Sequence, residues 1–159
     1  MIAPRDTINQ SLRQFAASIQ APRLELNEEG VCAFTYEGKY EVVIEVPEEA
    51  SKVYFYAPVI TLPTKQPSEL AGLYEKLLKL NAFSALTRGA TVALDPRQPH
   101  ILLCYQYPIH LMDEVRFYNV LTNFVLALDE LHKQLSDLEF AVPEAYSVSD
   151  PLQIFINRV

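Results

Sequence analysis

Glycine, cysteine and tryptophan are scarce in this 159-residue chain, which has four glycines, two cysteines and no tryptophan. None of the glycines lies in a pattern that could cradle a phosphate, so we expect no nucleotide-binding loop. Cys32 and Cys104 are 72 positions apart and fit no metal-ligand spacing. Since the N-terminal stretch MIAPRDTINQ lacks the apolar core of a signal peptide, we expect a cytoplasmic protein with both thiols buried and reduced.

Basic residues are also few, and the formal net charge is −7. No run of lysine or arginine interrupts this acidity, which argues against a nucleic acid or an anionic membrane surface as a partner. The longest apolar run, VYFYAPVI, is too short and too aromatic to cross a bilayer, so no membrane insertion is expected.

Motifs for catalysis are missing as well. His100, His110 and His132 share no metal-ligand spacing, and no serine lies in a Gly-x-Ser-x-Gly turn. Paired carboxylates such as Glu48 and Glu49 are adjacent in sequence, and adjacent side chains diverge instead of converging on one substrate. We therefore expect no enzyme, no cofactor and no metal; a small enzyme with dispersed acid–base residues is the alternative from another class.

Hydrophobic periodicity predicts a first helix followed by three strands. Residues 6–20 are predicted to form an amphipathic helix that Asp6 or Thr7 can cap, and Thr7 with Gln10 fits the spacing of a capping box. A period of two then predicts the strands VCAFTYE, YEVVIEV and KVYFYAPVITL, joined by short turns into an antiparallel meander. In the second of these strands, Glu41 and Glu45 are expected to face water.

Two further helices flank a predicted hairpin. The first covers residues 68–86, with Ser68 as its cap, and precedes the hairpin ATVALD/HILLCYQYPI. The second begins after Asp113 and runs from Glu114 to about Leu138, with apolar residues at heptad spacing. That seam could pair with a copy of itself as a coiled coil, but a helix that lies across a sheet needs the same stripe.

These elements predict an α+β fold, an antiparallel twisted sheet with helices in the order α-β-β-β-α-β-β-α. Residues 1–140 form the domain, and residues 141–159 form a C-terminal extension in which Leu152, Ile154 and Ile156 alternate. The first helix, the third strand and the central helix carry more apolar surface than one sheet with one covering helix can bury. Such a surplus indicates a binding surface, for a second copy of the chain or for another protein.

Three stretches, taken in order, resemble the class I type III secretion chaperones of the Tir-chaperone family. They are LRQFAASIQAPRLELNEEGVCAFTYEG, then VYFYAPVITLP with LYEKLLKLNAF, and last the hairpin that leads into the acid-capped helix. The likeness covers about residues 6–138. The family implies a homodimer without ATPase activity or cofactor. It binds the unfolded N-terminal segment of one or more effectors, keeps that segment secretion-competent and presents it to the secretion ATPase or export apparatus.

The resemblance implies two sets of site residues by position. The set that would contact the effector is Leu12, Phe15, Ile19, Phe34, Tyr36, Tyr54 and Phe55. The set that would form the dimer interface is Leu73, Tyr74, Leu77, Leu78, Asn81 and Leu102. The alternatives on the same scaffold are a YbjN-like binding or regulatory protein without an effector, and a regulator that sequesters another bacterial protein.

The extension after residue 140 departs from the usual length of the family. We hypothesise that its segment LQIFINRV mimics an effector strand and occupies a groove of its own or of a neighbouring molecule, because its apolar residues alternate.

Overall fold

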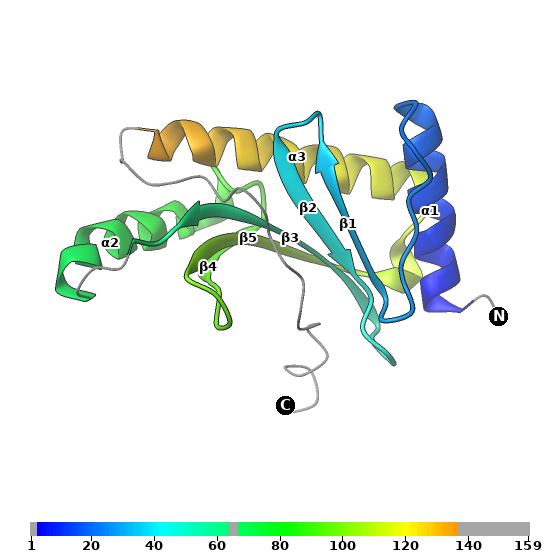
Figure 1. Cartoon of the computed structure of the whole chain (residues 1–159), viewed down its shortest axis with the longest axis horizontal. Helices are drawn as coiled ribbons and strands as arrows, with labels where there is room; N and C mark the ends of the chain where they lie inside the picture. The colour runs from blue at the N-terminus through cyan, green and yellow to red at the C-terminus, as the bar shows by residue number, and fades with distance from the viewer. Residues whose placement is uncertain (1–2, 64–66, 137–159) are drawn as a thin grey trace.

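A five-stranded antiparallel sheet, in the order β1-β2-β3-β5-β4, forms the centre of the computed structural model, which describes residues 3–63 and 67–136 (Figure 1). The strands are β1 (Val31–Tyr36), β2 (Tyr40–Glu45), β3 (Lys52–Thr61), β4 (Thr91–Leu94) and β5 (His100–Pro108). The helices are α1 (Pro4–Ser18), α2 (Ala71–Leu80) and α3 (Glu114–Leu135), with three short 3-10 helices, η1 (Pro67–Leu70), η2 (Ala82–Ser84) and η3 (Ile109–Leu111). The predicted fold class and element order are confirmed.

The sheet forms because the first three strands are joined by short connections and β5 then pairs with β3. Val43 lies opposite Tyr56 in the β2–β3 pair, and Phe55 lies opposite Tyr105 in the β3–β5 pair. The turn between β1 and β2 places Glu37 and Gly38 at positive φ, as a tight hairpin turn requires. β1 and β4 are therefore the two edges of the sheet among the described strands.

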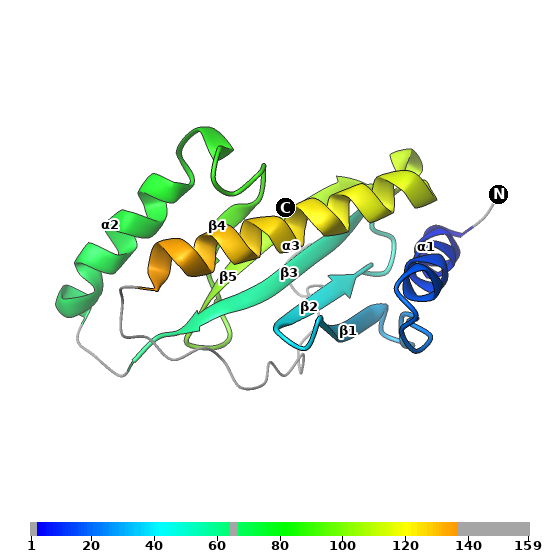
Figure 2. The same cartoon turned by 90° about the horizontal axis from the view of Figure 1, so that it is seen from above.

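α3 lies diagonally across one face of the sheet, which we call the inner face (Figure 2). The rings of Phe117 and Phe124 contact Phe55 of β3, with centroid distances of 5.9 and 6.3 Å. The apolar seam of α3 is buried from Phe117 to Leu135. Because the sheet covers this seam, the coiled-coil alternative is wrong for these positions; the last predicted seam residue, Leu138, lies outside the described residues.

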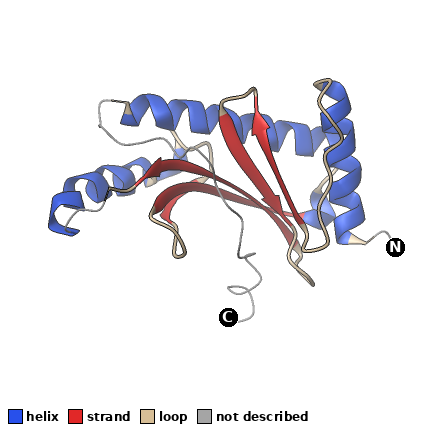
Figure 3. Ribbon diagram, viewed as in Figure 1, coloured by secondary structure: helices blue, strands red, loops and turns tan. Residues whose placement is uncertain are grey.

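α1 and α2 lie at opposite ends of the sheet (Figures 1 and 3). α1 begins earlier than predicted, at Pro4, and its N-cap residue Ala3 makes no side-chain capping bond. The predicted capping by Asp6 or Thr7 is therefore wrong, because both residues lie inside the helix. The start of α1 is instead held by Arg5, which donates to the carbonyl oxygens of Val46, Glu28 and Glu29 at 3.1, 2.9 and 3.0 Å.

Gly30 lies beside this arginine with φ +87°, and a Cβ at that position would collide with the carbonyl oxygen of Val46. The contact between α1 and the β1–β2 region therefore depends on a glycine at position 30.

The central helix is shorter than predicted. It ends at Leu80 instead of residue 86, and its N-cap is Leu70, without a side-chain bond from Ser68. Asn81 explains the end, because its side-chain oxygen accepts from the backbone N–H of Val92 at 2.8 Å and its amide donates to the carbonyl of the same residue at 3.0 Å. The chain then turns through Phe83, at φ 61°, towards β4.

The face of the sheet opposite α3, which we call the outer face, carries a carboxylate that was predicted to face water. Glu45 is completely buried, and its Oε2 accepts a hydrogen bond from the hydroxyl of Tyr56 at 2.8 Å. The expectation for Glu45 is therefore wrong, while Glu41, on the same face, is half-buried. The alternation itself was correct, but it does not reveal whether a face is covered.

Candidate functional site

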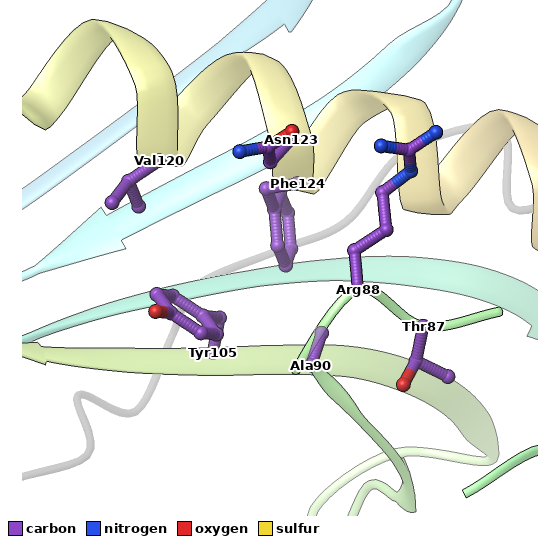
Figure 4. Close-up of a pocket in the computed structure, with 7 residues that line it drawn as sticks. All are labelled: Thr87, Arg88, Ala90, Tyr105, Val120, Asn123 and Phe124. Atoms are coloured by element: carbon purple, nitrogen blue, oxygen red, sulfur yellow. The ribbon is translucent and has the colours of Figure 1, made fainter. Parts of the chain in front are cut away.

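One hollow in the described part of the chain, of about 350 Å³, is open to solvent and is lined by Thr7, Gln10, Ser11, Met112, Asp113, Glu114 and Val115. A small, partly open pocket of about 60 Å³ lies between α3, β5 and the segment before β4 (Figure 4). The ring of Phe124 points into it beside Tyr105 and Ala90, and Arg88 extends alongside α3. Ligand pockets are typically about 300–1,000 Å³, so this one holds at most a small group.

Metal ligands do not gather either: in residues 3–63 and 67–136, no three His, Cys, Asp or Glu side chains are placed to hold an ion. Over the same residues, no helix is long and apolar enough to cross a membrane. Two open hollows with exposed apolar side chains are candidate protein-binding surfaces.

The first surface, which we call the α2–β4 patch, lies where α2 packs beside the edge strand. It is a shallow hollow of about 240 Å³, lined by Tyr74, Leu77, Leu78, Val92, Ala93, Leu94 and Ile101. Leu78 is 69% exposed and Leu94 is 55% exposed. Two large aliphatic side chains exposed beside a strand edge are unusual for a soluble monomer and indicate a protein contact.

The structure separates the six residues that were predicted to form the dimer interface. Leu73 and Leu77 belong mainly to the core, and Asn81 is bonded to β4. Tyr74 and Leu78 lie on the α2–β4 patch. Leu102 lies on the outer face with Tyr56 and is not among the residues that line the patch, although it lies opposite Ala93 of β4, which is.

The sequence analysis missed Leu94 at the α2–β4 patch. Its position in the hairpin signalled only a strand, and its exposure depends on where the sheet ends.

The second surface, which we call the α1–α3 groove, runs between α1 and the start of α3. It has a volume of about 270 Å³ and is lined by Ser11, Gln14, Phe15, Ser18, Glu114, Val115, Tyr118 and Asn119. Val115 is 70% exposed at its rim. Glu114 closes one side, because it accepts hydrogen bonds from Gln10, at 3.1 Å, and from Gln14.

An aromatic cluster supports this groove from below. The ring of Phe15 lies 6.3 Å from that of Phe34, 6.2 Å from Tyr36 and 6.0 Å from Tyr118. Burial, together with the negative charge of Glu37, raises the pKa of Tyr36, so its hydroxyl stays protonated and can donate. The cluster joins three elements, α1, β1 and α3, and it fixes the shape of the groove.

The residues predicted to contact an effector fall into three environments. Phe15, Phe34 and Tyr36 come together in the aromatic cluster, and Ile19 is partly exposed just beyond the end of α1. Leu12 and Phe55 are completely buried in the core. Tyr54 is paired with Glu45 of β2 and lies on the outer face.

Sequence reasoning missed Val115 and Tyr118 because neither belongs to the heptad seam of α3. Their exposure on the first two turns of the helix could have been anticipated only from the position of α1.

A polar cluster ties the β1–β2 turn to the second half of α3. Asp129 accepts from Lys39 at 2.8 Å, from the Tyr40 hydroxyl at 2.6 Å and from Lys133 at 2.7 Å. Lys133, Lys39 and Tyr40 hold the pKa of Asp129 well below its usual range. His132 stacks on Tyr40, with ring centroids 5.3 Å apart, and its burial lowers its pKa. This cluster holds the sheet against α3 and lies away from both apolar surfaces.

Comparison with known proteins gives a family and a fold. The model of the Tir chaperone protein (CesT) family matches residues 10–132. No curated protein sequence matches the chain.

Among solved structures, the ExsC-ExsE complex contains a chain with a TM-score of 0.68 at 19% identity, covering 91% of this chain and 100% of that one. The Yersinia pestis type III secretion chaperone SycH, in complex with a fragment of YscM2, has a TM-score of 0.56 at 26% identity, covering 79% and 99%. YbjN from E. coli has a TM-score of 0.57 at 16% identity, covering 84% and 95%.

Proposed function

The chain belongs to the Tir chaperone protein (CesT) family, and we propose that it acts in the bacterial cytoplasm as a type III secretion chaperone. It binds the N-terminal segment of one or more effectors in extended form and keeps that segment soluble and secretion-competent. The observation that carries the proposal is the α1–α3 groove, an open groove with both polar and apolar lining residues, with Val115 exposed at its rim and an aromatic base. SycH, which has the same fold, is described in complex with a fragment of another protein.

The client is proposed to use both the groove and the adjacent sheet edge. In the described residues no other strand than β2 pairs with β1, and its other edge is the one proposed to accept a strand of the client. An extended peptide can add main-chain hydrogen bonds there and place alternate apolar side chains into neighbouring hollows. Release needs no chemistry by this protein, only transfer of the client to the secretion ATPase or export apparatus.

The α2–β4 patch is proposed as the contact between two copies of the chain. Exposed leucines on α2 and β4 suit a homodimer, whose interface is more apolar than a transient one and buries about 1,200–2,000 Å² or more. Two copies would present two grooves, and a client long enough to contact both would gain affinity from a high effective concentration.

Co-expression with the neighbouring open reading frame tests the function. A chaperone should make a larger protein soluble and co-purify with it through that protein's N-terminal segment. Val115→Asp should abolish the rescue, since it places a charge at the rim of the groove, whereas Leu126→Asp is a matched control because Leu126 is exposed on α3 away from the groove. Equal rescue by both variants would contradict the groove as the binding surface.

A second candidate is a YbjN-like binding or regulatory protein without a secreted client, which the similarity to YbjN favours. It predicts that no N-terminal segment of a neighbouring protein is solubilised. A regulator that sequesters another bacterial protein would instead bind a folded, non-secreted partner, and the same co-purification would identify it.

A further inference from the structure

The outer face of the sheet carries an apolar stripe that crosses four strands. We call it the outer stripe, and it consists of Val31 of β1, Val43 of β2, Tyr56 of β3 and Leu102 of β5. Val43 and Tyr56 are opposite each other in the β2–β3 pair, and Cys104 of β5 is opposite Tyr56 on its other side. The stripe is separate from the main core, which holds the buried side chains of all three α-helices.

The outer stripe is buried although no described α-helix covers it. Val43 is 1% exposed and Tyr56 is 2% exposed, while α3 packs on the inner face. An antiparallel sheet with helices on one face normally presents polar side chains to water on the other. Here the outer face is apolar at its centre and holds the buried carboxylate of Glu45. Arg97, between β4 and β5, covers part of Tyr56, with its guanidinium carbon 6.0 Å from the ring centroid. Val31 and Val43 lie on β1 and β2, at the other end of the strand order, so their burial calls for a further cover.

The chain has enough residues beyond its described part to provide that cover. It continues for 23 residues after Ser136, as residues 137–159. Extended chain spans roughly 3.3 Å per residue, so even half of this length can pass from α3 around the sheet. Asp129 and His132, within the last two turns of α3, contact Lys39 and Tyr40, so α3 ends near the β1–β2 turn.

The composition of the last eight residues matches the outer face. Leu152, Ile154 and Ile156 alternate, and Arg158 continues the same row. Arg158 is the only basic residue in 137–159, and the outer face carries the carboxylates of Glu41 and Glu45 on β2. Opposite charges attract, so an arginine at the end of an apolar row suits the acidic side of this face better than it suits the core.

We propose that residues 152–159 bind the outer face of their own chain, with Leu152, Ile154 and Ile156 against the outer stripe and Arg158 beside the acidic residues of β2. The segment occupies this face and leaves the α1–α3 groove and the α2–β4 patch available. The hypothesis drawn from the alternation of LQIFINRV placed the segment in a groove of its own or of a neighbouring molecule. The inference assigns it to the outer face of its own chain. It does not depend on the proposed function, because it concerns a contact within one chain.

A native cysteine on the outer face allows a direct test. Cys104 lies beside Tyr56 and is half-buried, and burial raises the pKa of its thiol to about 12. Cys32 lies on the inner face under α1 and α3, with a thiol whose pKa burial raises to about 11, and it serves as an internal reference. Because the thiolate is the reactive form, removing the cover should speed alkylation of Cys104 and leave Cys32 unchanged.

The experiment compares iodoacetamide labelling of each cysteine in the full chain by mass spectrometry. The variant Ile154→Asp/Ile156→Asp should raise the labelling rate of Cys104 on the order of tenfold, because a local cover opens without global unfolding. The control Gln153→Asp/Asn157→Asp adds the same charge on the other side of the segment and should leave the rate unchanged. A synthetic peptide of residues 148–159, added to the first variant, should restore protection.

Four outcomes would overturn the proposal. One is an unchanged rate at Cys104 in the Ile154/Ile156 variant, and another is an equal rise in both variants. A parallel rise at Cys32 would mean that the segment stabilises the whole domain instead of covering one face. A rate in the unmodified chain that increases on dilution would assign the segment to a second copy.

Discussion

α2 and α3 carry leucine rows at similar spacing, yet the two helices use them differently. In α3 the row from Phe117 to Leu135 is buried by the sheet of the same chain, and its exposed apolar residues lie on other sides of the helix. α2 is less than half as long as α3. It buries Leu73, Leu77 and Leu80, whereas Leu78 is largely exposed to solvent. A regular apolar row thus identifies the core side of a helix, whereas an exposed apolar residue outside that row indicates a binding surface only where it lines a hollow, as Leu78 and Val115 do.

The same distinction applies to the two apolar surfaces. The α2–β4 patch is lined almost entirely by apolar side chains, while the α1–α3 groove has Glu114, Ser11, Gln14 and Asn119 among its lining residues. A dry aliphatic patch suits a permanent contact between copies. A groove with hydrogen-bonding groups suits clients of varied sequence, because polar groups at its rim can adapt to different main chains.

The largest effect should come from the buried row of α3. Phe117→Ala removes a ring that contacts both Phe15 and Phe55, and it should lower the free energy of unfolding by about 3–5 kcal/mol. Leu126→Ala, on the exposed side of the same helix, should change it by less than about 0.5 kcal/mol. Urea unfolding followed by circular dichroism measures both. Similar losses of unfolding free energy in the two variants would mean that the buried row of α3 contributes no more to stability than its exposed side.

The next largest effect should come from the solvent-exposed residue Leu78 of α2. Leu78→Glu places a charge at the centre of the α2–β4 patch and should weaken the proposed dimer about 100-fold. Light scattering should show monomers at concentrations where the unmodified protein is dimeric, with an unchanged circular dichroism spectrum. Leu77→Glu is a poor test, since Leu77 is buried and its loss would unfold the chain. A dimer that persists in Leu78→Glu would place the interface elsewhere.

A smaller effect is expected at the α1–α3 groove. Tyr118→Ala removes one ring from the aromatic cluster and opens the groove, and it should weaken client binding roughly tenfold while leaving the molecular mass unchanged. Calorimetry with the N-terminal segment of the client measures the affinity. If the molecular mass changed and the affinity for the client did not, the α1–α3 groove would be the contact between copies instead of the client-binding surface.

The smallest effect should be a pH-dependent one at Asp129. Its pKa is lowered in the folded protein, so its contribution to stability is present above its unfolded pKa, near 4, and is lost as the pH falls through its folded value. Asp129→Asn should therefore lower the Tm slightly at pH 7, and the difference should shrink in strong acid. The exposed ion pairs with Lys39 and Lys133 limit the size of the effect. A difference that grew in acid would contradict this account.

Much of the fold followed from the sequence because periodicity and caps are local signals. Asp113 caps α3 as predicted, with its side chain accepting from the backbone of Arg116 at 2.7 Å. The end of α2 could not be predicted, because it depends on the bond between Asn81 and Val92, two segments that meet only in the folded chain.

For the site, the sequence indicated that apolar surface was in excess but not where it lay. Of the residues predicted to contact an effector, Phe15 and Tyr36 lie in the aromatic cluster under the α1–α3 groove and Phe55 is core, whereas Val115 at the rim of the groove was not predicted. Whether an apolar side chain faces the core or the solvent depends on what covers it. That cover is set by tertiary packing, which the spacing of residues along one strand or helix does not record.

The three bonds from Arg5 to the carbonyls of Val46, Glu28 and Glu29 have a consequence for binding kinetics. They fasten the first turn of α1 to the rest of the domain, so one wall of the groove is already in place when a partner arrives. The conformational entropy lost on association then falls almost entirely on the incoming peptide. Complexes should accordingly form in a single fast phase whose rate rises in proportion to peptide concentration, without a plateau set by rearrangement of the host.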